Sequence, residues 1–231
     1  MSESARSLFD ELNVELAEIE VYDFITRDSG LQRSACERAA VLLKRLGQLK
    51  RDAVADNDEW LANVLLGYEC AVTFVRSSIS MWILLKAERP DDAWDELVNA
   101  QLAVADAVRA DKGFERLSIH ADRLQFVEEA LFPRQVFTSL GIVVKSRKCS
   151  ICGEEYGECH HVVGRPYMGE ICYTRIVELE RLDHLSFVSN PANKRTRIRE
   201  FSDGGGRRNR MTWKVHPHRE GTEEPEPSPS E

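Results

Sequence analysis

Four of the six cysteines in this 231-residue chain fall within 24 residues, and two histidines lie among them. A Cys-x2-Cys pair followed by glycine forms a tight turn that aims two thiolates at one metal ion. Zinc takes four nitrogen or sulfur ligands in a tetrahedron, and a site closed by four protein ligands is structural rather than catalytic. The spacing therefore predicts one structural zinc ion, with candidate ligands Cys149, Cys152, Cys159, His161 and Cys172.

The two ligands of the turn, Cys149 and Cys152, are the firmest part of this prediction. The other two ligands come from Cys159, His161 and Cys172, and the sequence leaves open which of them close the site. His160 is the weakest candidate, because neighbouring side chains of an extended chain point in opposite directions.

The cellular compartment expected from the sequence favours metal binding over disulfides. The N-terminus is acidic and polar, unlike a signal peptide, and no apolar run approaches the ~18 residues that span a bilayer. We therefore expect a cytoplasmic protein without membrane contact, in which clustered cysteines bind metal rather than form disulfides. The two isolated cysteines, Cys36 and Cys70, lie in helical patterns and are expected to be small core residues.

Three classes of metal enzyme are alternatives to a structural site. The chain has no His-Glu-x2-His motif of a metalloprotease, and it lacks the His-x-Glu that precedes the cysteines of a nucleobase deaminase. A His-Asn-His-type metal nuclease is the strongest alternative, with His160 or His161 as the base. The nearest downstream His and Asn are His184 and Asn190, and the six residues between Cys152 and Cys159 are too few for the usual hairpin. An enzyme is therefore the less favoured interpretation.

A basic stretch follows the cysteine cluster. Alternation of Arg195, Arg197 and Arg199 would place three guanidinium groups on one face of a strand. Such a surface could bind nucleic acid through phosphates, but pairing with an acidic protein surface, or simple solvation, is favoured because the whole chain has a net charge of −8. The tentative nucleic-acid-binding residues are Lys194, Arg195, Arg197, Arg199, Arg207, Arg208 and Arg210.

The elements that position these residues follow from hydrophobic periodicity. Apolar side chains recur at helical spacing over residues 4–24, 31–51, 60–87, 90–112 and 117–131. The third stripe is the broadest, so we expect that helix to be central. Asp28, Asp58 and Pro90 are suited to begin helices. These patterns predict an α-helical bundle over residues 1–133.

The periodicity changes after Pro133. Alternation predicts strands over 136–144, 171–179 and 185–188, and so a β-rich zinc-binding module over 134–201. Residues 202–231 are expected to be a basic linker and an acidic, disordered tail. The chain as a whole is predicted to be α+β. Charge follows the same division, with 16 basic and 25 acidic side chains in residues 1–139, and 14 and 9 in residues 140–218.

A resemblance adds to this interpretation over about residues 139–200. The pattern C-x2-C-G…C-x-H-x2-G-x2-Y-x-G-x2-C from Cys149 to Cys172 resembles a small zinc-knuckle segment of bacterial and phage proteins without established activity. The phrase from Val188 to Asn193, V-S-N-P-A-N, is similar to the end of the phage prohead-protease type of domain. The resemblance implies a bacterial or phage origin and a place in a multi-component system such as phage defence, and it transfers no catalytic residue.

The function predicted from the sequence is therefore a non-enzymatic zinc-binding adaptor or accessory subunit with a protein partner. A nucleic-acid-binding protein is the second hypothesis and a metal nuclease the third. The sequence does not name the partner or the oligomeric state.

Overall fold

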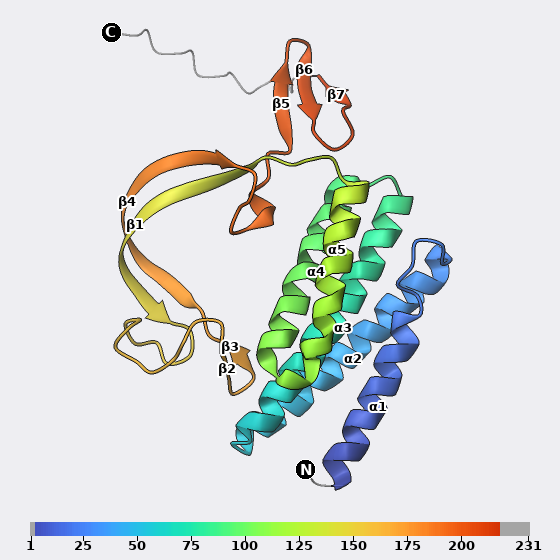
Figure 1. Cartoon of the computed structure of the whole chain (residues 1–231), viewed down its shortest axis with the longest axis vertical. Helices are drawn as coiled ribbons and strands as arrows, with labels where there is room; N and C mark the ends of the chain where they lie inside the picture. Colours follow the sequence, from blue (N-terminus) through green and yellow to red (C-terminus); the bar gives the residue numbers. More distant parts are fainter. Residues whose placement is uncertain (1–2, 218–231) are drawn as a thin grey trace.

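A computed structural model describes residues 3–217 of the chain, which is an α+β protein with its helices first (Figure 1). The α-helices of the described part form a bundle, and a short 3-10 turn, η1 (Lys112–Leu117), precedes the last of them. These helices are α1 (Glu3–Glu20), α2 (Ser29–Ala55), α3 (Glu59–Lys86), α4 (Pro90–Ala110) and α5 (Ser118–Leu131). The five predicted helices are thus confirmed.

The helix starts follow the local chemistry that the sequence indicated. The carboxylate of Asp28 accepts hydrogen bonds from the backbone N–H groups of Gly30 and Leu31, and that of Asp58 accepts one from Leu61. These contacts satisfy N–H groups that have no partner within the helix. Pro90 occupies the first turn of α4, where its missing N–H costs nothing.

Helix α3 is the centre of the bundle, packed between α2 and α4, as predicted from its broad apolar stripe. Leu65, Phe74 and Ile79 of α3 are almost fully buried, as are Trp94 and Leu97 of α4. The bundle therefore contains a hydrophobic core of its own, and burial of apolar surface is the main force that holds it together.

One carboxylate is buried in the connection between α1 and α2. Asp23 accepts hydrogen bonds from the Ser78 hydroxyl and from Trp82 Nε1, and Arg123 of α5 lies 3.2 Å away. Burial raises the pKa of Asp23, although these three partners act in the opposite direction. The group joins the first connection to α3 and α5 by polar contacts within the apolar bundle.

A long antiparallel hairpin leaves the bundle after Pro133. Its strands are β1 (Phe137–Cys149) and β4 (Thr174–Val188), and together they form an arch beside α4 (Figure 1). Register shifts near Gly141, Val143, Val144 and Ser146 interrupt the ladder, and such bulges bend and twist a strand. The prediction of two strands at 171–179 and 185–188 was wrong, because residues 174–188 continue as one strand through the polar residues between those apolar runs.

The far end of the hairpin returns to the bundle. A two-residue turn at Met168 and Gly169, both with positive φ, joins β2 (Pro166–Tyr167) to β3 (Glu170–Ile171). The Gly169 N–H donates to Asn63 Oδ1 of α3 at 2.8 Å. A Cβ at Gly169 would lie 2.8 Å from the side chain of Lys50 and 3.3 Å from the Ala62 carbonyl oxygen, so both the positive φ and the close approach favour glycine. The arch is thus attached at both of its ends.

The expected basic linker is instead a small sheet in the described residues. The strands β5 (Glu200–Asp203), β6 (Gly206–Asn209) and β7 (Val215–His216) form a three-stranded antiparallel sheet, preceded by the 3-10 turn η2 (Lys194–Thr196). The prediction of a linker is wrong, because these polar Arg- and Gly-rich residues pair as strands, and Asn209 Nδ2 donates to Asp91 and fastens the sheet to α4. The predicted disordered tail lies outside the described residues.

Among the residues that the structure describes, no helix combines the length and apolar character needed to cross a membrane.

Candidate metal centre

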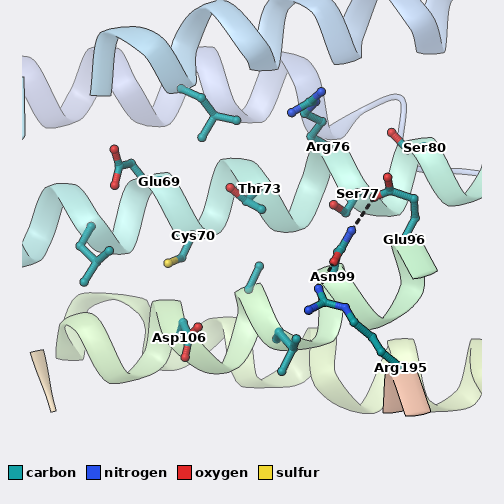
Figure 2. Close-up of a pocket in the computed structure, with 14 residues that line it drawn as sticks. Glu69, Cys70, Thr73, Arg76, Ser77, Ser80, Glu96, Asn99, Asp106 and Arg195 are labelled. Carbon is teal, nitrogen blue, oxygen red and sulfur yellow. Dashed lines mark hydrogen bonds between the residues drawn. The ribbon is translucent and has the colours of Figure 1, made fainter. Parts of the chain in front are cut away.

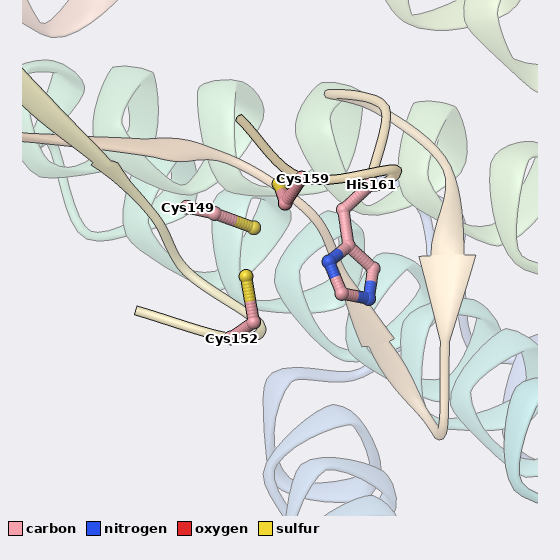
Figure 3. Close-up of side chains that lie close together, drawn as sticks. All are labelled: Cys149, Cys152, Cys159 and His161. Atoms are coloured by element: carbon pink, nitrogen blue, oxygen red, sulfur yellow. The ribbon is translucent and has the colours of Figure 1, made fainter. Parts of the chain in front are cut away.

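The first two ligand candidates lie where β1 ends. Cys149 is the last residue of the strand, and the chain then turns through Cys152. The Gly153 N–H donates to Cys149 O at 3.0 Å, and the Cys149 N–H donates to Glu154 O at 2.9 Å, so the turn closes on itself. Gly153 has φ 77°, the left-handed conformation that glycine adopts readily. This local geometry brings the Cys149 and Cys152 thiols to one side of the turn (Figure 3).

The loop after this turn supplies two more ligand-type side chains. The sulfur atoms of Cys149, Cys152 and Cys159 and a ring nitrogen of His161 all lie within 4.8 Å of one another. Figure 3 shows the three thiols and the imidazole converging on one point. These four residues are the group that could hold a metal ion, and all four were candidates from the sequence. His160, the weakest candidate, is not part of the group.

His161 gives the strongest independent sign of an ion. Its Nδ1 is buried and has no hydrogen-bond partner among the described residues. The ring lies edge-on to Tyr167, with centroids 4.7 Å apart, which fixes its orientation beside the thiols. A buried polar nitrogen without a partner is costly, and coordination of a metal would satisfy it.

Cys172 lies beside the group but outside it. Its buried sulfur is 3.8 Å from that of Cys149, close to the separation of two sulfurs that share a zinc ion at Zn–S distances of about 2.3 Å. Its backbone bonds to Gly164 and Arg165 hold it against the loop. Cys172 is therefore either a thiol that donates to the Cys149 sulfur or an alternative fourth ligand.

The thiols of this cluster share their protons unequally. Burial by itself raises the pKa of Cys149, but hydrogen bonds from the backbone N–H groups of Cys152 and Ile151, and from the Cys152 and Cys172 thiols, lower it to about 6. For Cys152, the backbone N–H of Glu154 lowers the pKa, but burial and the sulfurs of Cys149 and Cys159 outweigh it and raise the pKa overall. Burial also raises the pKa of Cys172. The cluster thus stabilises one thiolate even without an ion. The thiolate is the form of cysteine that binds metal.

The remaining cysteines have no such surroundings. Cys36 and Cys70 lie in α2 and α3, as the helical patterns indicated, but both are half-buried rather than core residues, and Cys70 lines the groove on α3. Burial raises the pKa of Cys70 to about 12, so its thiol is protonated at neutral pH. Neither residue belongs to the four-membered group.

The basic stretch contacts the bundle. Arg197 pairs with Asp91, Arg199 with Asp95 at 3.1 Å, and Arg195 donates to Asn99. These three partners recur every fourth residue and therefore lie on one face of α4. The Arg197 side chain is only 1% exposed. Residues 194–196 form η2 rather than part of a strand, yet all three guanidinium groups reach the same helix.

The other members of the basic stretch also have intramolecular partners. Lys194 pairs with Glu128, Arg207 with Glu200 and Arg208 with Asp203, while Arg210 donates to Arg134 O. The structure thus brings Lys194, Arg195, Arg197 and Arg199 to α4 and α5 of the same chain, whereas Arg207 and Arg208 pair with acids of the small sheet itself. The sequence favours pairing with an acidic protein surface, or solvation, over nucleic acid for this stretch, and the structure has pairing with acids of the same chain's helices for Lys194, Arg197 and Arg199.

A second concave region lies on α3, between α2 and α4 (Figure 2). This groove of about 580 Å³ is lined by both polar and apolar side chains, mostly of α3 and α4, and is bordered by Arg195. Asn99 links two opposite charges there, because it accepts from Arg195 and donates to Glu96. Two further acids of the groove are neutralised within the chain, Glu69 by Lys50 and Asp106 by Arg109.

The residues needed for a His-Asn-His nuclease are not brought together. His184 lies opposite Gly141 in the ladder, whereas Cys149 lies opposite Thr174. Eight residues of strand separate these levels, which corresponds to roughly 26 Å at about 3.3 Å per residue. Comparison of the chain with protein-family models, with curated proteins and with solved structures gave no match.

Proposed function

We propose that this chain is a non-enzymatic, zinc-binding adaptor or accessory subunit. One Zn²⁺ ion would be held by Cys149, Cys152, Cys159 and His161, with Cys172 as the alternative ligand. The observation that carries this proposal is the convergence of three thiols and one buried, unpartnered imidazole nitrogen within 4.8 Å. Soft thiolates with an imidazole are the donor set that favours zinc.

The ion's role in this proposal is structural. Four protein ligands leave no position for substrate or water, so the site would hold a fold rather than perform a reaction. It would fasten the end of β1 to the loop that leads to β2 and β3, and that loop places Gly169 against Asn63 of α3. The chain's own residues then keep the hairpin arched beside the bundle.

A held hairpin is suited to present a binding surface. Large apolar side chains of the hairpin, among them Leu140, Leu182 and Leu185, are more than half exposed. Extensive exposed apolar surface marks sites of association between proteins. The resemblance of residues 139–200 to bacterial and phage zinc-knuckle segments is the support for a place in a multi-component system such as phage defence.

Nucleic-acid binding is the weaker alternative. Phosphate contacts require guanidinium groups that are free to approach a backbone. Here Arg197 is buried, and its neighbours Arg195 and Arg199 donate to α4. These contacts with α4 would have to break before the three arginines could bind phosphates.

The proposal is tested by metal content together with partner binding. We expect about one zinc per chain, and Cys152→Ser should lower both the zinc content and the recovery of co-purifying protein. Cys70→Ser is the matched control, because it removes a thiol from outside the cluster. Full partner recovery by a metal-free Cys152→Ser chain would contradict the structural role, and metal-dependent cleavage of DNA by the purified protein would contradict the non-enzymatic one.

A further inference from the structure

A separate pocket of about 260 Å³ lies between α1, α3 and η1. It shares no residue with the groove of Figure 2 or with the metal centre. Its walls are mostly apolar and include four aromatic rings, those of Phe9, Trp60, Tyr68 and Phe114. Ligand pockets are typically apolar with a few polar groups, and their volumes begin near ~300 Å³. The size of this pocket therefore suits a molecule of one or two rings.

The four rings form one continuous wall. Phe9 stacks on Tyr68 with centroids 5.8 Å apart, and its ring meets Trp60 edge-on at 6.0 Å. Tyr68 in turn meets Phe114 edge-on at 5.1 Å. Trp60 is 49% exposed, so the wall reaches solvent at that residue. Aromatic faces and edges of this kind are favourable partners for another ring.

The wall is held in place by the fold. A Cβ at Gly67 of α3 would lie 2.2 Å from the Phe114 ring, so Phe114 packs directly on the helix backbone where only glycine leaves room. The Tyr68 hydroxyl donates to Asn13 Oδ1 at 3.1 Å and thereby joins α3 to α1. A pocket whose walls are already ordered loses less conformational entropy when a ligand binds.

Two charged side chains of opposite sign line the pocket, Arg116 and Asp111. The carboxylate of Asp111 accepts from the Gly113 N–H at 2.7 Å and so caps η1. Arg116 is exposed and has no ion pair or side-chain hydrogen bond with the other residues that the structure describes. Burial raises the pKa of Tyr68, while the bond to Asn13 and the positive charge of Arg116 lower it, so the guanidinium lies near the aromatic wall.

We propose that this pocket binds a small aromatic carboxylate, with its ring against the aromatic wall and its carboxylate on Arg116. A guanidinium with free donors pairs with a carboxylate through two parallel hydrogen bonds. Aromatic rings also attract cations, but Arg116 would repel a cationic ligand. Asp111 can accept from an N–H on the ring of the same ligand. The inference goes beyond the proposed function, because no residue of the pocket belongs to the hairpin or the metal centre.

The test uses three probes that share an indole ring and differ in charge: indole-3-acetate, indole and tryptamine. Isothermal titration calorimetry of the zinc-loaded full chain measures each affinity. We expect indole-3-acetate to bind with a dissociation constant below about 1 mM, which is ordinary for a ligand of this size. It should bind about tenfold more tightly than indole, because only the acid pairs with Arg116, and tryptamine should bind most weakly.

Arg116→Gln separates the role of the charge from that of the ring. It should weaken binding of indole-3-acetate by about tenfold and leave the affinity for indole unchanged. Arg51→Gln is the matched control, because Arg51 is an exposed arginine of α2 outside the pocket, and it should change neither affinity.

Trp60→Ala tests the aromatic wall and should weaken both indole-3-acetate and indole. Its control is Trp213→Ala, which removes an exposed tryptophan from the C-terminal sheet. Far-UV circular dichroism of each variant ensures that lost folding is not mistaken for lost binding. Chemical shifts of the amides of α1, α3 and η1 should change on titration with indole-3-acetate, which places the probe in this pocket.

Three outcomes overturn the inference. They are no saturable binding of indole-3-acetate, tighter binding of tryptamine than of indole-3-acetate, and binding that neither Arg116→Gln nor Trp60→Ala weakens. Chelation of zinc should leave the affinity for indole-3-acetate unchanged, because the pocket is built from the bundle alone. The outcome of this test is thus independent of whether the zinc-binding adaptor is correct.

Discussion

The helical bundle and the β1–β4 hairpin module are held together by different forces. Each of α2, α3 and α4 buries a continuous set of apolar side chains, including Leu46, Leu65 and Leu97. Between residues 138 and 188 the only buried hydrophobic side chains are two cysteines, Cys149 and Cys172. The same chain thus contains one region with a core and one with almost none.

This difference indicates in which region a metal ion would contribute most to stability. Burial of apolar surface contributes roughly 25 cal/mol per Å², which suffices for the bundle but has little area to act on in the hairpin module. Small segments without a core are commonly stabilised by metal or disulfides. The ligand cluster lies in the region of this molecule that lacks a core, which is where its contribution to folding would be largest.

The largest predicted effect is removal of the metal. Structural zinc binds with about 10–16 kcal/mol of apparent free energy, so chelation should remove the protection of residues 145–172 from hydrogen exchange. The buried stretches of α2, α3 and α4 should keep theirs, because their core does not involve the cluster. Hydrogen exchange followed by mass spectrometry measures both regions in one sample.

Re-addition of zinc is the control and should restore protection. Equal loss of protection in the bundle would show that the two regions unfold as one unit. Unchanged protection at residues 145–172 would show that the polar contacts of the loop are sufficient without an ion.

The second prediction concerns the bundle. Leu65→Ala removes a fully buried side chain from the central helix and should cost about 2–5 kcal/mol of unfolding free energy through lost burial and an internal cavity. Thermal or denaturant unfolding monitored at 222 nm measures the loss. Leu102→Ala in α4 is the control, because that side chain is exposed and its removal should be nearly neutral. Unchanged zinc content in Leu65→Ala would confirm that the cluster folds separately from the core.

The bundle could be predicted from sequence because its signals are local. Apolar spacing, the caps at Asp28 and Asp58, and Pro90 each fix a helix within a few residues of the chain. Cys149 and Cys152 were equally accessible, since a turn of four residues determines their geometry. The sequence could not predict that Cys159 and His161 join this pair while Cys172 lies beside the group, because this depends on how a loop folds back in space.

The hairpin and the C-terminal sheet depend on distant contacts. Residues 180–184 look like a break between two strands, but pairing with β1 carries the strand through them with bulges. Residues 202–216 look like a linker in the sequence, because the contact that fastens them to α4, between Asn209 and Asp91, joins residues more than a hundred positions apart. Non-local pairing of this kind leaves no periodic signal in the sequence.

The smallest predicted effects compare two arginines at the boundary between the regions. Arg197 is buried, pairs with Asp91 and lies over the Trp94 ring, whereas Arg199 and Asp95 pair in solvent. Arg197→Ala should cost about 2–3 kcal/mol, below the range for fully buried pairs because Asp91 keeps some contact with water. Arg199→Ala should cost no more than about 1 kcal/mol, and less in high salt.

Hydrogen exchange at residues 200–209 locates the effect. If polar contacts attach the C-terminal sheet to the bundle, Arg197→Ala should increase exchange there while exchange within the buried stretches of α2 and α3 stays unchanged. Equal effects of the two substitutions would mean that burial of Arg197 adds nothing to its ion pair. A loss confined to Arg197→Ala would instead show that the boundary between the two regions is held by one buried guanidinium, which both contacts Asp91 and packs on a core tryptophan.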